Sequence, residues 1–434
     1  CMNIGIFYKG DDGKFHLDYD TFLGRFLKAS EVVRYEKMYY CYDSEQGIWR
    51  QRDLEDIQLE AARFLESETG ESWNVAYKKQ TLEKLKVATQ EVKEMNQSDV
   101  KVCLRNGVLD VEQGSFRKQF DKRCYFTNRL EVDFDKSARA PVFEKFLEEV
   151  SCGNQRRKRT LEEFMGLALT KKIGKGKAMV LRGTGNNGKS VYLNILCELL
   201  GADRWTSISI QELPNFGASV LPGKTLAVMS EISEENSRNL MTTELKQLIT
   251  GENMWCNVKY HDARSIRPYV KVLILTNHKI GTSADDSDGA LRRLFIMPFE
   301  YHVPDEDVDL ELVEKLKGEL SGILNISVKG YKRLARQGFV YSAQEESDRL
   351  IERYLKTENP MRSFIKEKII FQQGAKISYS EFTMRFQKWG GENEIDFPTD
   401  LDSKQIFSEV KKHFEIERYK SGGIRGMKNI AVKK

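Results

Sequence analysis

The chain has 434 residues, of which 40% are hydrophobic and 31% are charged, and its formal net charge is +4. That length is too great for one compact core and predicts two to four domains. The small net charge means that any nucleic-acid surface must come from local clustering, and the longest apolar runs fall far short of the ~20 residues of a membrane span.

Residues 1–145 are expected to form a mixed, largely helical N-terminal domain that acts as a collar for oligomerisation. The stretches "DLEDIQLEAARFLES" and "TLEKLKVATQEVKEM" read as helices, and "VVRYEKMYYCYD" and "GIWRQR" are rich in aromatic residues. The segment "CLRNGVLDVEQGSFRK" predicts two short strands around the turn "EQG".

Residues 146–340 have a different pattern, in which helical pieces alternate with the apolar runs "AMVLRG", "TSISIQ", "TLAVMSE", "VKVLILTN" and "LRRLFIMPF". Such alternation predicts an α/β domain with a largely parallel sheet covered on both faces. Residues 341–434 begin with a charged helix that ends before Pro360. Helices near 360–368, 379–389 and 403–413, followed by two strand-like pieces, predict a winged-helix-like C-terminal domain.

The motif "LRGTGNNGKS" follows the first of these apolar runs. It meets the spacing GxxxxGK[ST] with Gly183, Gly188, Lys189 and Ser190. Glycines allow backbone N–H groups to turn inward around a phosphate, and the helix that follows adds the positive end of its dipole. The alternative is a turn rich in glycine and asparagine. Because strand, loop and helix occur in the right order, we interpret the motif as a phosphate-binding loop for ATP.

The predicted nucleotide-binding residues are Gly183, Thr184, Gly185, Asn186, Asn187, Gly188, Lys189, Ser190 and Val191. Lys189 is expected to neutralise the β- and γ-phosphates, and Ser190 to ligate Mg²⁺.

Three further elements supply the candidate catalytic groups. Glu231 follows an apolar strand and could polarise the attacking water, and Asn277 ends the strand "VKVLILTN" and could orient that water. Arg292 and Arg293 precede another strand, from which one of them could reach the nucleotide of a neighbouring subunit. Each residue alone could be an ordinary surface group, but all occur in order within about 110 residues.

Together these motifs resemble superfamily 3 helicases of the AAA+ class, specifically the helicase portion of phage, plasmid and poxvirus primase-helicases. The matching segments include "GTGNNGKS", "LAVMSE", "KQLITGE", "VKVLILTN" and "ALRRLFIMPF". The likeness extends to "NGVLDVEQGSF" upstream and "NPMRSFIKEKI" downstream. The resemblance implies a hexameric ring that hydrolyses ATP, with Arg293 as the slightly preferred residue acting across the subunit interface. One departure is Ser230, which precedes Glu231 in place of a second acid, so Mg²⁺ would rest on Ser190, water and Glu231.

A strand, a turn and a second strand are predicted between Met254 and Lys271, directly before the asparagine strand. The resemblance implies that this hairpin points into the ring channel and contacts single-stranded DNA, and the candidate DNA-binding residues are Lys259, Tyr260, His261 and Arg264. An ordinary surface hairpin is the alternative. The tail from Leu401 carries nine Lys/Arg against four Asp/Glu, a surplus that could bind duplex DNA or a protein.

We therefore expect an ATP-dependent DNA helicase that unwinds duplex DNA during replication of a phage, plasmid or mobile element. The alternative is an ATP-switched DNA-loading or origin-binding factor without processive unwinding, and a packaging or transposition ATPase is a third reading. Expected partners are single-stranded and forked DNA, further copies of the chain and a primase or polymerase domain or other replication proteins. Seven scattered cysteines with no CxxC pair argue against a zinc site and favour a cytoplasmic location.

Overall fold

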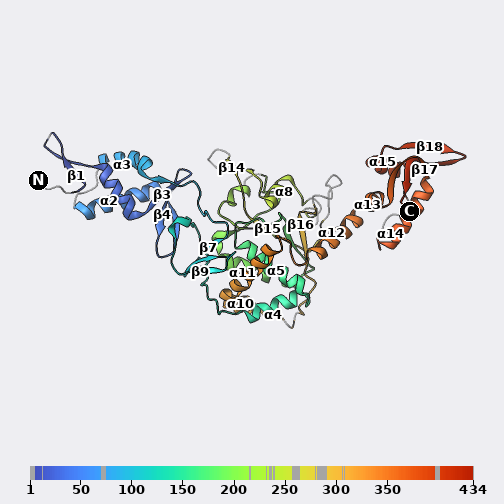
Figure 1. The fold of residues 1–434 in the computed structure, drawn as a ribbon, viewed down its shortest axis with the longest axis horizontal. Coiled ribbons are helices and arrows are strands. Elements are labelled where there is room, and N and C mark those ends of the chain that lie inside the picture. The colour runs from blue at the N-terminus through green and yellow to red at the C-terminus, as the bar shows by residue number, and fades with distance from the viewer. Residues whose placement is uncertain are drawn as a thin grey trace.

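The computed structural model describes residues 5–433, except for 12, 70–74, 215–216, 231, 234–236, 238–239, 257–263, 279, 281–290, 305, 307 and 396–400. Figure 1 shows three parts along the longest axis: an N-terminal part, a central part built around a sheet, and a C-terminal part. No helix in the described part of the chain combines the length and the apolar character that crossing a membrane requires.

The central part contains a five-stranded sheet in which every pairing is parallel. Its strands are β10 (Ala178–Arg182), β11 (Trp205–Ser207), β12 (Leu226–Met229), β15 (Lys271–Thr276) and β16 (Leu294–Pro298). The strand order is β11-β12-β15-β10-β16. The predicted α/β class with a parallel sheet is confirmed, and β15 separates β10 from β12.

Alternating residues of β10 face two different cores, as the two-residue period of a strand requires. Met179 and Leu181 pack into one core, whereas Ala178 and Val180 pack into the other. The first core is formed with the helices α4 (Pro141–Val150), α5 (Gln155–Ala168), α6 (Lys189–Leu200), α10 (Leu312–Lys317) and α11 (Leu320–Arg336). The second core is formed with the 3₁₀ helix η3 (Gly217–Val220), α8 (Thr243–Thr250), the hairpin strand β13 (Met254–Cys256) and α12 (Gln344–Glu358). The hairpin and α11 therefore lie on opposite faces of the sheet.

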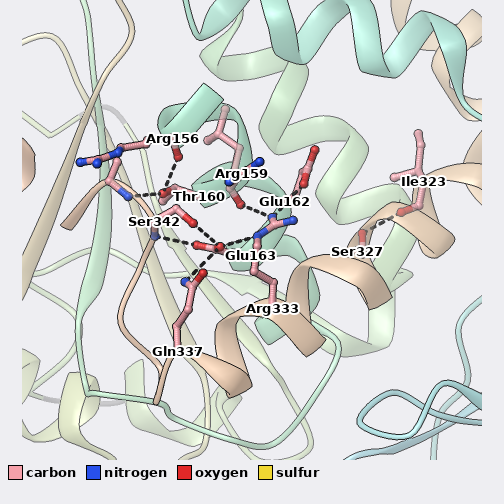
Figure 2. A network of polar contacts seen from close by, with 12 residues as sticks. Arg156, Arg159, Thr160, Glu162, Glu163, Ile323, Ser327, Arg333, Gln337 and Ser342 are labelled. Atoms are coloured by element: carbon pink, nitrogen blue, oxygen red, sulfur yellow. Dashed lines mark hydrogen bonds and ion pairs between the residues drawn. The ribbon is translucent and has the colours of Figure 1, made fainter. Parts of the chain in front are cut away.

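Helices α5 and α11 pack closely because each has a glycine at the contact. A Cβ atom at Gly166 would lie 2.2 Å from the carbonyl oxygen of Ser327, and one at Gly330 would lie 2.3 Å from that of Glu162. Figure 2 shows the polar network beside this contact, centred on the buried carboxylate of Glu163. Glu163 accepts hydrogen bonds from Arg333 Nε at 2.7 Å and from Ser342 Oγ at 2.6 Å. The network fixes the start of the chain segment that leads into α12.

The N-terminal part combines helices with strands, as expected of a mixed domain, and it has more strands than the expectation of a largely helical domain foresaw. The structure has here the strands β1 (Phe7–Lys9), β2 (Phe15–Leu17), β3 (Val32–Tyr35), β4 (Met38–Asp43), β5 (Ile48–Arg52), β6 (Gln90–Glu91), β7 (Lys101–Leu104), β8 (Gly107–Asp110) and β9 (Ser115–Arg117). The helices are α1 (Tyr19–Ser30), α2 (Leu54–Thr69), α3 (Val75–Ala88) and the 3₁₀ helix η1 (Lys122–Cys124). The aromatic-rich runs form β3, β4 and β5, since aromatic and β-branched side chains suit a pleated surface. The predicted "EQG" turn joins β8 to β9, with Gly114 at a φ of 68°.

The C-terminal part has a hydrophobic core of its own. Its elements are α13 (Pro360–Lys368), β17 (Ile369–Ser378), α14 (Tyr379–Glu392), α15 (Ser403–Lys411), β18 (Glu417–Ser421) and β19 (Ile424–Val432). The three expected helices and the two final strands are present, but β17, which pairs with β19, was not foreseen. Most of β17 is exposed, and an irregularity between Phe371 and Lys376 interrupts its register, so no clear alternation marks it in the sequence. The winged-helix class and the domain boundaries near 145 and 340 stay predictions.

Candidate nucleotide-binding site

The glycine-rich loop at 183–188 lies at the carboxyl edge of the parallel sheet. It connects β10 to α6, which begins at Lys189. Ligands of open α/β sheets bind at this edge, where neighbouring connections run in opposite directions. The position of β10 between β15 and β16 places the loop at such a point.

Two glycines of the loop are required by its geometry. A Cβ atom at Gly183 would lie 2.0 Å from Asn187 Nδ2 and 2.3 Å from the carbonyl oxygen of Phe299. Gly188 has a φ of 83°, which disfavours any other residue, and a Cβ there would also lie 2.7 Å from Val150. The loop can therefore follow this path only with glycine at both positions.

Backbone hydrogen bonds hold the loop to both neighbouring strands. Gly183 N donates to the carbonyl oxygen of Thr276 at the end of β15, at 3.3 Å. On the other side, Phe299 N donates to the carbonyl oxygen of Arg182 at 2.7 Å, and Val303 N donates to that of Asn186 at 2.9 Å. The conformation of the loop is thus set by the sheet and by the segment after β16.

The ammonium group of Lys189 is buried inside the loop. Its Nζ donates to the carbonyl oxygen of Gly183 and to Asn187 Oδ1, both at 2.9 Å. Asn187 is itself oriented by a 3.1 Å hydrogen bond from its Nδ2 to the carbonyl oxygen of Phe299. Burial lowers the pKa of Lys189 below its ordinary value of 10.5. In the described part of the chain, Lys189 has only neutral oxygens as partners, so an anion would stabilise its charge.

The donor set of the loop suits the phosphates of a nucleotide. Gly188 caps α6 without any side-chain hydrogen bond, so the first N–H groups of the helix have no side-chain acceptor. Such a helix terminus binds anions through its N–H groups and its dipole. The exposed Ser190 adds a hydroxyl in the first turn. Lys189, the helix terminus and Ser190 thus lie together at the start of α6, and this donor set fits a phosphate and its metal ion.

The structure places Asn277 at the same edge of the sheet as the loop. Asn277 is exposed and directly follows Thr276, whose carbonyl oxygen contacts the loop. The side chain of Thr276 is buried, and its Oγ1 accepts a 3.0 Å hydrogen bond from His278 N. The turn after β15 is therefore ordered beside the loop.

Arg292 and Arg293 lie at the opposite edge of the sheet. They directly precede β16, and the carbonyl oxygen of Arg293 accepts a 2.9 Å hydrogen bond from Ala178 N at the start of β10. A five-residue strand spans roughly 16 Å, which separates the two arginines from the loop of their own chain. Arg292 is exposed and Arg293 half-buried.

Several predicted residues lie outside the described part of the chain. They are Glu231, which comes two positions after the end of β12, and Lys259, Tyr260 and His261, which come between β13 and β14 in the sequence. Arg264 begins β14 (Arg264–Ile266), which pairs with β13 so that Arg264 lies opposite Cys256. The predicted strand–turn–strand arrangement is therefore present at its base.

Sequence reasoning missed two side chains beside the loop. Arg182, the last residue of β10, contacts Tyr354 of α12, which is 172 positions further along the chain. A cation directly before a glycine-rich loop was a visible signal, whereas nothing in the sequence marked Tyr354 as its partner.

Comparison with known proteins gives two family matches and a fold likeness. Residues 20–152 match the family described as "D5 N terminal like", and residues 181–293 match a family of unknown function, DUF5906. The chain is similar to the apo structure of the C-terminal region of NrS-1, with a TM-score of 0.55 and 12% identity over 95% of this chain and 99% of that one. The A form of the same region gives a TM-score of 0.52 and 13% identity over 94% of this chain and 99% of that one. At this identity the likeness concerns the fold, and it extends over nearly the whole length of both chains.

Proposed function

We propose that the protein is an ATP-dependent DNA helicase of the ring-forming AAA+ type, acting in the replication of a phage, plasmid or mobile element. The observation that carries the proposal is the buried ammonium of Lys189, held within the 183–188 loop at the start of α6. The D5 N-terminal-like match supports a replication role, since the resembling primase-helicases carry such a region before their ATPase.

The strand order supports hydrolysis in addition to binding. Neighbouring strands lie about 4.8 Å apart, so β12 is roughly 10 Å from β10, with β15 between them. All three strands are parallel, so the residues that follow β12 lie at the same edge of the sheet as the loop that carries Lys189, on the other side of the end of β15. Glu231 would act as the base on that water, and Asn277 would orient it.

ATP and Mg²⁺ would be held by this chain's own groups. Lys189 and the N–H groups at the start of α6 would bind the phosphates, and Ser190, with Glu231, would ligate the Mg²⁺. The metal ion would supply charge neutralisation at the phosphates. Arg292 and Arg293 lie too far from the loop of their own chain to contact its nucleotide. One of them, with Arg293 preferred, would therefore act on the nucleotide of a neighbouring copy. Such a contact requires an oligomer.

The hairpin of β13 and β14 would contact the translocated strand. Trp255, in β13, is 75% exposed, and an exposed aromatic ring of this kind provides a surface for base stacking. Lys259, Tyr260, His261 and Arg264 would add phosphate contacts and a further ring near the tip. Binding of this kind is independent of sequence and weakens as salt is added.

Strand displacement from a forked DNA substrate tests the proposal. The purified protein is expected to separate the strands only with ATP and Mg²⁺, and Lys189→Ala is expected to abolish both displacement and hydrolysis. A protein that hydrolyses ATP and assembles on DNA but never separates the fork would contradict the helicase and favour the ATP-switched loading factor. Circular dichroism of Lys189→Ala checks that the variant is folded.

A further inference from the structure

Helix α11 presents a basic groove on the face of the sheet opposite to the hairpin. The groove has a volume of about 530 Å³ and is lined by Lys329, Lys332, Arg333, Arg336 and Gln337. With 3.6 residues per turn, the four cations fall within a sector of about 100° on the helix surface. The other side of α11, with Ile323, Tyr331 and Leu334, is buried in the core shared with α5 and α6.

Two of the four cations have structural partners. Arg333 binds Glu162 at 2.8 Å and Glu163 at 2.7 Å, and it belongs to the network in Figure 2. Lys332 donates a 2.7 Å hydrogen bond to the carbonyl oxygen of Gln113 and so holds the β8–β9 turn against the helix.

The remaining two, Lys329 and Arg336, are exposed and have no ion pair among the described residues. Arg159 of α5 is also exposed, and its carbonyl oxygen accepts a 2.9 Å hydrogen bond from Arg333 Nη2, which places it beside the groove. Like charges three and four residues apart on a helix destabilise it. Lys332 is three residues from Lys329 and four from Arg336, so these three cations repel one another in the free chain, and a bound anion would relieve the repulsion.

We propose that the groove of α11 binds the phosphate backbone of a DNA strand that runs outside the channel. Lys329 and Arg336 are separated by about 10 Å along the helix, so the two cations can contact different phosphates of one strand. The lining residues that the structure describes include no aromatic or apolar side chain of the kind that forms the centre of protein interfaces, whereas phosphate contacts come mainly from Lys and Arg. An acidic protein partner is accordingly the less suitable ligand.

The location of the groove distinguishes this contact from the proposed channel contact. The hairpin strand β13 belongs to the second core of the sheet and α11 to the first, so the sheet separates the two surfaces. A forked DNA has two single strands, and one can follow the hairpin while the other follows α11. The inference goes beyond the proposed function, since phosphate binding in the groove requires no nucleotide.

Binding of labelled DNA by the full chain without nucleotide tests the inference. The charge-reversal pair Lys329→Glu and Arg336→Glu is expected to weaken binding of a forked DNA about tenfold and to lower the salt slope by about two. A short oligo-dT strand occupies only one of the two surfaces, and the hairpin stays available to it in these variants, so its binding is expected to change less than twofold. The neutral pair Lys329→Gln and Arg336→Gln should give an intermediate loss, which separates charge from misfolding.

The pair Lys28→Glu and Lys136→Glu, exposed cations outside the groove that have no ion pair among the described residues, is the matched control and should bind the fork like the unmutated chain. Unchanged fork binding in the α11 variant would overturn the proposal, as would an equal loss with oligo-dT. Polyglutamate is tested as a competitor at the charge concentration at which unlabelled DNA displaces the fork. If polyglutamate displaces the fork equally well, the groove would instead be assigned to an acidic protein. These binding measurements contain no ATP, so they do not depend on helicase activity. They would remain valid even if the unmutated protein failed to displace a strand.

Discussion

The guanidinium of Arg182 lies over the ring of Tyr354, with its central carbon 5.3 Å from the ring centroid, and its Nη1 donates a hydrogen bond to the tyrosine hydroxyl. Arg182 directly precedes Gly183 of the glycine-rich loop. Burial raises the pKa of Tyr354, so its hydroxyl stays protonated at neutral pH. The contact joins the end of β10 to the middle of α12.

Helix α12 also contacts the C-terminal part. Two residues beyond Tyr354, Lys356 Nζ lies 2.9 Å from Glu367 of α13 and 3.1 Å from Asn393 Oδ1, which follows α14. The same helix therefore touches the residue before the loop and two elements of the C-terminal core.

Two substitutions of Tyr354 should lower the free energy of unfolding by different amounts. Tyr354→Phe keeps the ring but removes the acceptor, and we expect it to lower the free energy of unfolding by about 1 kcal/mol. Tyr354→Leu also removes the cation–π contact and should lower it by about 2 kcal/mol, with weaker nucleotide binding. Urea denaturation and nucleotide titration measure both effects. Tyr8→Leu, at an exposed tyrosine, is the control, and equal losses in the Phe and Leu variants would contradict a role for the ring.

Nucleotide affinity should depend on the protonation of Lys189. Because burial lowers its pKa below 10.5, Lys189 loses its proton at a lower pH in the folded chain than in the unfolded one. Burial of the charged ammonium therefore lowers the free energy of unfolding at pH values below the pKa of the folded chain. This destabilisation disappears as the pH rises towards 10.5. Bound phosphate favours the charged form, so we expect the affinity to be constant near neutral pH and to fall as the pH approaches 10.5.

Titration of the nucleotide at several pH values measures this dependence. Lys189→Arg carries a group that stays charged over the same range and should show a flat profile, even if its affinity is lower. A parallel fall in both proteins would show that Lys189 is not the titrating group.

The network around Glu163 should contribute strongly to stability. Glu163→Ala removes the carboxylate that accepts hydrogen bonds from Arg333 Nε, Ser342 N and Ser342 Oγ. These three groups then remain partly buried without that acceptor. Breaking a buried ion pair costs about 3 kcal/mol or more, and we expect a loss of that order in the free energy of unfolding. Glu162→Ala removes a more accessible partner of the same arginine and should cost less, about 1 kcal/mol. Similar losses in the two variants would show that the burial of Glu163 adds nothing.

Local patterns were sufficient to predict the central strands and the loop. A strand buried on both faces is a continuous apolar run, as in "AMVLRG". A loop of the phosphate-binding type needs glycine at fixed spacing, as in "GTGNNGKS". Both structures can therefore be predicted from residues that are adjacent in the sequence. The aromatic runs of the N-terminal part were less clear, because helices and short strands alternate there within a few residues.

The sequence by itself therefore determined the position of the glycine-rich loop proposed to bind a nucleotide, since the loop, its lysine and the helix that follows are consecutive. Only the tertiary structure decided that β15 separates β10 from β12, that Arg182 pairs with Tyr354, and that Arg292 and Arg293 lie at the far edge of the sheet. It also decided that the cations of α11 gather on the face away from the hairpin. Such relationships join residues far apart in the chain, and they depend on how the helices and strands pack and not on the propensity of any one segment.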